Sequence, residues 1–131
     1  MKAKKDILVI DDDPDIAEYC GTVLGSHGYQ VRSAISAKEG EDALRAQRPD
    51  LVILDIMMES PESGLQLADV IARDFRGLPV ILFSSIANAS MQVFDTSKLP
   101  VSVIIEKPIE PQELLATVRK ILKDESDDTP A

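Results

Sequence analysis

Acidic residues stand directly after two short apolar runs of the chain. Asp11, Asp12 and Asp13 follow the first run, and Asp55 follows the third. Carboxylates that lie close together repel one another unless a cation neutralises them. A hard divalent cation such as Mg²⁺ does this through oxygen ligands, and it takes only one or two protein carboxylates because it keeps several waters. Since an aspartate can also act as a nucleophile and form an acyl phosphate, these acids point to metal-assisted phosphoryl transfer.

Two later apolar runs end in groups that suit the same chemistry. Ser84 and Ser85 follow the fourth run, and Glu106 and Lys107 follow the fifth. A serine hydroxyl can donate a hydrogen bond to a phosphoryl oxygen, and a lysine supplies a point charge for another. The metal and the lysine together would offset the charge that develops as a phosphoryl group is transferred.

Five short apolar runs predict five strands, and the segments between them carry helical periodicity. Strands that alternate with helices imply βαβ units with right-handed crossovers, and a parallel sheet covered on both faces. In such a sheet the ligand site lies beyond the carboxyl ends of the strands, where the acids, the serine and the lysine stand. The predicted strands are Ile7–Ile10, Tyr29–Ala34, Leu51–Leu54, Pro79–Phe83 and Val101–Ile105.

Capping and breaking residues place the helices between these strands. Asp13 and Pro14 open the first helix, because Asp is a favoured N-cap and Pro is tolerated at the first helical position. Ser36 caps the second helix, and Pro111 starts the last one. The predicted helices run from Pro14 to Gly25, from Ser36 to about Gln47, from a loop at residues 57–64 to Gly77, over residues 86–98, and from Pro111 to about Leu122.

Length and composition predict one domain without disulfides. The 131 residues are enough to bury a single core, and 44% of them are apolar. Residues 1–123 are expected to form the domain, and residues 124–131 an acidic, flexible tail. Cys20 is the only cysteine, so no internal disulfide can form; this favours the cytoplasm, and Cys20 is expected in the core.

The net charge and the hydropathy of the sequence argue against nucleic acid and membranes as direct partners. A net charge of −9 argues against direct binding of nucleic acid through a basic face. No apolar run approaches the ~20 residues that a membrane span requires, so no membrane association is expected. The start of the chain also lacks the apolar core and the cleavage site of a signal peptide.

The segments IDDDPD, LDIMM, PVILFSS and EKP, which follow one another at successive strand ends, resemble the response-regulator receiver domain of two-component signalling. Each segment alone is a weak signal, but four in this order are strong, and the resemblance covers residues 6–122. It implies a CheY-like, doubly wound, three-layer α/β sandwich with five parallel strands in the order 2-1-3-4-5. It also implies a signalling switch rather than an enzyme, with at most self-phosphorylation from small donors and autodephosphorylation.

The resemblance assigns roles to the acids. Asp55 would be the phosphoacceptor and would also contact Mg²⁺. Asp12 would bind Mg²⁺, with Asp11 binding it directly or through water, and the backbone carbonyl of Met57 would be a further ligand.

The resemblance also assigns roles at the last two strand ends and implies partners. Ser84 would be the switch hydroxyl, Lys107 would pair with the phosphate, and Pro108 would hold the bend after the lysine. A sensor histidine kinase or a phosphotransfer protein would supply the phosphoryl group. A downstream protein, which the sequence does not identify, would read the change in binding.

The chain departs from the family pattern at three places, one of which is the segment LPVS that replaces the usual glycine-alanine before the fifth strand. The family usually has a proline four residues after the acceptor and a glycine eight after it, whereas this chain has Glu59 in the first position and places Pro61 and Gly64 later. The family often has an aromatic residue three positions before the lysine, and here that residue is Ile104. These departures leave open a pseudo-receiver, an interaction module that is never phosphorylated.

An enzymatic alternative also stays open at this point. The segment DDDPD is similar to the start of haloacid-dehalogenase-type phosphatases, in which Asp11 would be the nucleophile and Asp13 the general acid. The sequence lacks the later acidic metal pair and the cap domain of those enzymes, which makes this interpretation the weaker one.

Overall fold

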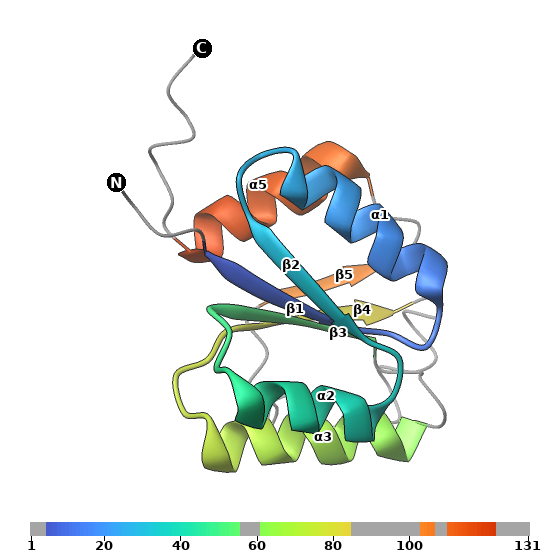
Figure 1. Ribbon diagram of the computed structural model, residues 1–131, viewed down its shortest axis with the longest axis vertical. Helices are drawn as coiled ribbons and strands as arrows, with labels where there is room; N and C mark the ends of the chain where they lie inside the picture. Colours follow the sequence, from blue (N-terminus) through green and yellow to red (C-terminus); the bar gives the residue numbers. More distant parts are fainter. Residues whose placement is uncertain (1–4, 56–60, 85–102, 107–109, 123–131) are drawn as a thin grey trace.

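The computed structural model describes residues 5–55, 61–84, 103–106 and 110–122 (Figure 1). Within these ranges five parallel strands pair in the order β2-β1-β3-β4-β5. The predicted α/β fold with a parallel sheet is therefore confirmed. The elements are β1 (Asp6–Ile10), α1 (Pro14–Gly25), β2 (Gln30–Ala34), α2 (Ala37–Ala46), β3 (Leu51–Asp55), α3 (Pro61–Asp74), β4 (Val80–Ser84), β5 (Val103–Glu106) and α5 (Pro111–Leu122).

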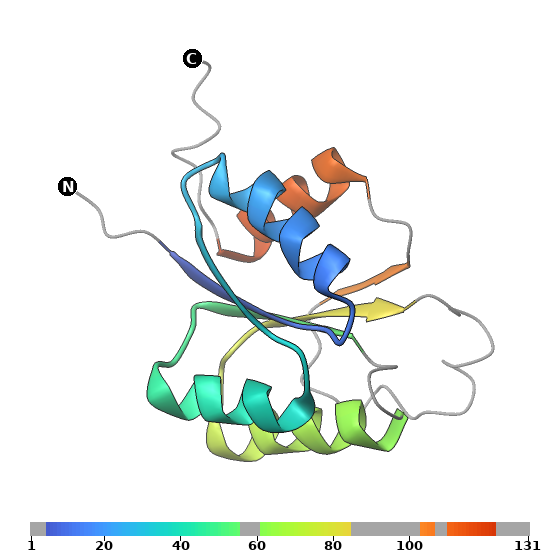
Figure 2. The same cartoon turned by 45° about the vertical axis from the view of Figure 1, so that its right-hand side comes forward.

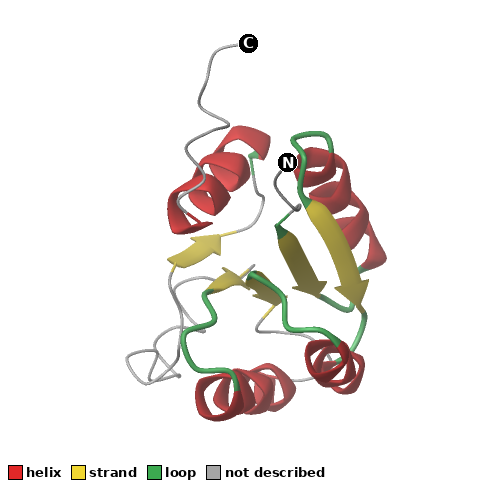
Figure 3. Ribbon diagram, turned by 60° about the vertical axis from the view of Figure 1, so that its left-hand side comes forward, coloured by secondary structure: helices red, strands yellow, loops and turns green. Residues whose placement is uncertain are grey.

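The described elements form three layers. Helices α1 and α5 cover one face of the sheet, and α2 and α3 cover the other (Figure 1 and Figure 3). Two clusters of buried apolar side chains fill the spaces between the sheet and these helix pairs. Cys20 is fully buried in the cluster beneath α1 and α5, as predicted. Every residue of the central strands β1 and β3 is buried, which is typical of a parallel sheet covered on both faces.

The predicted starts of α1 and α2 are confirmed by their capping hydrogen bonds. Asp13 is the N-cap of α1 and its side chain accepts a hydrogen bond from the backbone N–H of Asp15 at 3.0 Å. Ser36 is the N-cap of α2 and its hydroxyl accepts from the N–H of Glu39 at 3.1 Å. The Glu39 carboxylate in turn accepts from the N–H of Ile35 at 3.2 Å, so two backbone donors at this helix start are satisfied by side chains.

Several boundaries differ from the predicted ones. Residues 61–64 were predicted as part of a loop, but α3 begins at Pro61, because proline is favoured in the first turn of a helix. Strand β1 includes Asp6, and strand β4 extends to Ser84. The predicted helix over residues 86–98 and the predicted boundary between domain and tail at residue 123 lie outside the described residues. None of the helices in the described ranges is long and apolar enough to cross a bilayer.

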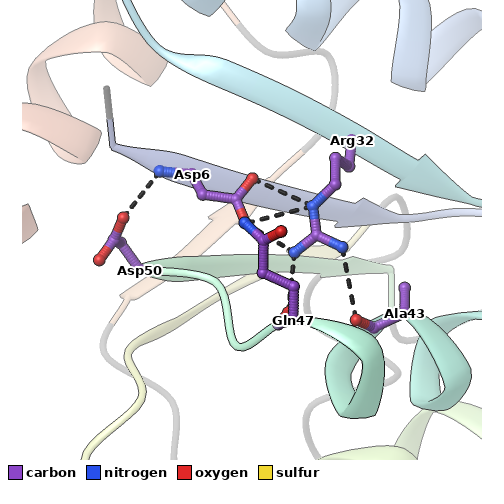
Figure 4. Close-up of polar contacts among 5 residues, drawn as sticks. All are labelled: Asp6, Arg32, Ala43, Gln47 and Asp50. Carbon is purple, nitrogen blue, oxygen red and sulfur yellow. Dashed lines mark hydrogen bonds and ion pairs between the residues drawn. The ribbon is translucent and has the colours of Figure 1, made fainter. Parts of the chain in front are cut away.

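A partly buried ion pair joins β1 and β2 at the end of the sheet where β1 begins (Figure 4). Arg32 of β2 donates from Nη2 to the Asp6 carboxylate at 2.6 Å and from Nε to both carboxylate oxygens at 3.1 Å. The same guanidinium donates to the backbone carbonyls of Gln47 and Ala43, at 2.9 and 3.4 Å, at the end of α2. The Asp50 side chain accepts the N–H of Asp6 at 2.7 Å. We call this group the Asp6–Arg32 clamp; it joins β1, β2, α2 and the start of β3.

A second ion-pair network lies on the surface between α2 and α3. Arg45 Nη2 donates to Glu41 at 3.0 Å and to Asp74 at 2.9 Å, and its guanidinium carbon lies 5.6 Å from the centre of the Phe75 ring. The hydrogen bond from Arg45 holds the pKa of Asp74 below its ordinary value, and a hydrogen bond from Arg73 acts in the same direction. The ionised Asp74 side chain therefore stabilises the folded state more than the protonated side chain does.

This pKa shift predicts a pH-dependent effect of Asp74→Asn. A carboxylate whose pKa is lowered on folding contributes stability above its unfolded-state pKa of 3.8, and loses it as the pH falls through the lower folded-state pKa. Asp74→Asn is expected to lower the melting temperature by the same small amount at about pH 7 and about pH 5, and by progressively less near about pH 3. Calorimetric melts of both proteins across this range measure the difference. A deficit that persists unchanged into acid would show that the charge of Asp74 is not involved.

Candidate functional site

The two buried acids of the candidate site come from neighbouring strands. Ile10 of β1 pairs with Leu54 of β3 in the parallel register, so the next residues, Asp11 and Asp55, lie at the same edge of the sheet. Both are buried, with 1% and 4% of their surface exposed, whereas Asp12 is exposed. The strand arrows in Figure 2 end at this edge, beyond which a ligand site is expected in a parallel sheet.

Hydrogen bonds fix the backbone from Asp11 to Asp13. The N–H of Asp11 donates to the carbonyl of Ala34 in β2 at 3.0 Å, which holds the end of β1 to its neighbour. The Asp11 side chain accepts from the N–H of Asp13 at 2.9 Å, so it closes the turn into α1. Asp13 itself is occupied as the N-cap of that helix. The local sequence thus uses one acid as a cap and one as a turn-former, and leaves Asp12 at the exposed corner.

The three acids Asp11, Asp12 and Asp55 come together at this edge. Each offers a carboxylate oxygen, and these oxygens all lie within 4.8 Å of one another. Three like charges at this separation repel one another, and the repulsion is strongest where burial removes water. Oxygen ligands at one exposed and two buried positions fit a hard divalent cation that retains part of its water shell.

The other predicted site residues are placed only in part. Ser84 is the last residue of β4, and in the register it lies opposite Glu106 of β5, which Lys107 follows in the chain. Ser84 therefore ends the strand next to the one that ends in Asp55. Met57, Lys107 and Pro108 lie outside the described residues.

One residue beside the site was not identified from the sequence as part of it. Gly40 lies in α2 and packs against Ile10, the residue that directly precedes Asp11. A glycine inside an otherwise helical pattern is the signal that could have drawn attention to it, because glycine destabilises a helix interior relative to alanine.

Comparison with known families and proteins gives a consistent result. Residues 7–119 match the response regulator receiver domain family. NtrX of Azorhizobium caulinodans, a nitrogen assimilation regulatory protein, is 33% identical over 119 residues, which is 90% of this chain and 26% of NtrX. MtrA of Mycolicibacterium smegmatis, a DNA-binding response regulator, is 32% identical over 125 residues, which is 95% of this chain and 53% of MtrA. The chain thus spans about a quarter and about half of the length of these two relatives.

A solved structure resembles the whole of the chain. The CheY-like receiver domain protein from Methanospirillum hungatei has a TM-score of 0.84 and 25% sequence identity, and the match covers 96% of this chain and 99% of that one. The fold is therefore a CheY-like α/β fold, and the strand ends that carry the acids correspond to those of a known domain type.

Proposed function

The chain belongs to the response regulator receiver domain family, and on this premise we propose that it is a phosphorylation-dependent switch of a two-component system or phosphorelay that accepts a phosphoryl group on Asp55. The observation that carries the proposal is the position of the Asp55 carboxylate, which lies at the end of β3 with carboxylate oxygens of Asp11 and Asp12 within 4.8 Å. A sensor histidine kinase or a phosphotransfer protein would supply the group. Altered binding to a partner protein would pass the signal on.

We propose that Mg²⁺ binds at this acidic site. Asp11, Asp12 and Asp55 would hold it through carboxylate oxygens, together with the backbone carbonyl of Met57. When bound, Mg²⁺ neutralises the carboxylates and the phosphoryl oxygens, so that an anionic donor can approach an anionic acceptor. The clustering of three carboxylates at the ends of two adjacent strands supports this assignment, because a set of oxygen ligands suits a hard divalent cation.

In the proposed reaction Asp55 acts as the nucleophile. One carboxylate oxygen of Asp55 forms a bond to phosphorus as the bond between phosphorus and the donor nitrogen breaks. The electron pair of that bond stays on the departing imidazole, and the product is an acyl phosphate on Asp55. Asp55 is only 4% exposed, and this burial restricts the orientations of its side chain and so favours one line of attack.

Two further residues would bind the transferred group. We propose that the Ser84 hydroxyl donates to a phosphoryl oxygen and acts as the switch, and that Lys107 pairs with another oxygen. The position of Ser84 at the end of β4, beside the strand that carries Asp55, supports its role. Pro108 would hold the bend that follows Lys107.

The remaining proposals concern the protein as a whole. We propose a folded unit of residues 1–123 with an acidic tail at 124–131, acting in the cytoplasm without direct contact to nucleic acid. The net charge of −9 supports the last point, since binding to phosphates needs a basic surface.

Phosphorylation by a small donor tests the proposed function directly. The purified protein is incubated with acetyl phosphate, with and without Mg²⁺, and intact-mass spectrometry then counts added phosphoryl groups. One group is expected, only with Mg²⁺, and reduction of the acyl phosphate with borohydride should convert residue 55 to homoserine. Absence of uptake under all conditions, together with absence of beryllofluoride binding, would instead support the pseudo-receiver, and label at Asp11 would support the phosphatase-like alternative.

Mg²⁺ is also expected to stabilise the fold, and Asp12→Asn to weaken the effect. At a Mg²⁺ concentration a hundred times its Kd, the free energy of unfolding should rise by about 2.7 kcal/mol over that in a chelator. Asp12→Asn removes one ligand charge, so a tenfold loss of affinity should reduce this rise to about 1.4 kcal/mol at the same concentration. Urea unfolding in both conditions measures it. Glu18→Gln, an exposed change on α1, is the control and should keep the full rise.

A further inference from the structure

Helix α2 approaches strand β1 closely just before the acidic residues begin. The point of approach is Gly40, which is buried inside α2 and whose N–H donates to the carbonyl of Ser36 at 2.8 Å. A glycine in the interior of a helix destabilises it relative to alanine. The packing around Gly40 should therefore explain why a glycine stands at this position.

The reason is the side chain of Ile10. A Cβ atom at position 40 would lie 2.7 Å from Ile10 Cδ1, 3.0 Å from its Cγ2 and 3.1 Å from its Cγ1. Non-bonded carbon atoms ordinarily stay about 3.5–4.0 Å apart. Ile10 is fully buried, and a β-branched side chain has few alternative rotamers. A side chain at position 40 would thus push on Ile10 as a whole rather than on one mobile methyl group.

Ile10 belongs to the row of residues that immediately precedes the acids. It is the last residue of β1 and is followed by Asp11. In the register it pairs with Ala34 on one side and with Leu54 on the other, and Leu54 is followed by Asp55. These three apolar side chains lie in one cluster on the α2 side of the sheet. Displacement of Ile10 would therefore be transmitted to both strands that carry the carboxylates.

We propose that Gly40 is a positioning residue for the acidic site. Its lack of a side chain lets α2 hold Ile10 in place, and this fixes the spacing between the acids after β1 and the carboxylate of Asp55. The proposal rests on the proposed function, since it takes Mg²⁺ as the ligand whose affinity reports that spacing.

Gly40→Ala tests this role through metal affinity rather than activity. The Kd for Mg²⁺, measured by isothermal titration calorimetry, should rise about tenfold, as is usual when a residue that supports metal ligands is changed. Gly21→Ala is the matched control, because Gly21 also lies in a helix but a Cβ there would meet nothing within 4 Å. Its Kd should stay within about twofold of the wild-type value, while far-UV circular dichroism checks that both variants fold.

Ile10→Val provides the rescue, because it removes Cδ1, the atom nearest to the added methyl group. The double variant G40A/I10V should recover the affinity to within about twofold of the wild type. An unchanged Kd in Gly40→Ala, or a loss that the double variant does not recover, overturns the proposal. If Gly40→Ala fails to fold, the double variant decides alone by the same criterion. A wild type that does not bind Mg²⁺ overturns the proposed function as well, whereas wild-type binding with an insensitive Gly40→Ala overturns only this inference.

Discussion

Asp55→Asn is expected to abolish phosphoryl uptake from acetyl phosphate while leaving the fold more stable in the absence of metal. The amide has the shape of the carboxylate but not its nucleophilic charge, so the initial rate should fall by at least about 10³-fold, the scale seen when a nucleophile is removed. The same change deletes one of three like charges whose oxygens lie within 4.8 Å. The free energy of unfolding in a chelator should therefore rise by roughly 1–2 kcal/mol, because the change removes two pairs of like charges, each worth about 1 kcal/mol at about 4 Å in water.

The opposite signs of the two effects make this prediction specific. A variant that merely misfolded would lose uptake and stability together, so the phosphorylation assay is paired with urea unfolding in a chelator. Asp69→Asn is the matched control, because Asp69 is an aspartate on α3 with 76% of its side chain exposed. Its uptake should be unchanged and its stability should shift by less than about 0.5 kcal/mol. Uptake by Asp55→Asn at the wild-type rate would assign the acceptor to another residue.

The placement of the acids could be predicted from the sequence because it depends on local patterns. Short apolar runs mark the strands, and in a parallel sheet the carboxyl ends of all the strands lie at the same edge. Asp11 and Asp55 follow such runs directly, so their meeting follows from the topology without knowledge of distances. Asp13 as a helix cap was predictable for the same reason, since a cap depends only on the residues beside it.

Features that depend on contacts between distant segments were not predictable in this way. Asp6 and Arg32 are 26 residues apart and meet only because β1 and β2 pair in one particular register. The contact between Gly40 and Ile10 likewise depends on how closely α2 lies on the sheet. The start of α3 at Pro61 was missed because proline and serine near a glycine are typical of loops, and also of the first turn of a helix.

Arg32→Ala is expected to lower the free energy of unfolding by about 3 kcal/mol. The Asp6 side chain is only 7% exposed, so removal of its partner would leave a buried carboxylate with much of its charge uncompensated. The backbone carbonyls of Gln47 and Ala43 would lose a donor as well. The loss should lie at the low end of the roughly 3–5 kcal/mol that follows the breaking of a buried pair, because 25% of the Arg32 side chain is exposed and water can enter after truncation. Urea unfolding at neutral pH measures the loss.

Asp6 and Arg32 should contribute unequally to the free energy of unfolding, and a double-mutant cycle can separate their contributions. Asp6→Asn should cost less than Arg32→Ala, about 1–2 kcal/mol, because the guanidinium left behind can reach water. The double variant should be more stable than the sum of the single losses predicts, by about 1–2 kcal/mol, since each single change already removes the same contact.

Arg73→Ala is the control for the loss of an arginine, because its ion pairs lie on the surface and its side chain is 63% exposed. It should change the stability by less than about 0.5 kcal/mol.

The clamp lies where β1 begins and the acids lie where it ends, so Arg32→Ala should leave the Kd for Mg²⁺ within about twofold of the wild-type value as long as the domain is folded. Additive losses in the cycle would show that Asp6 and Arg32 act independently, and a large change in metal affinity would show that the two ends of the sheet are coupled.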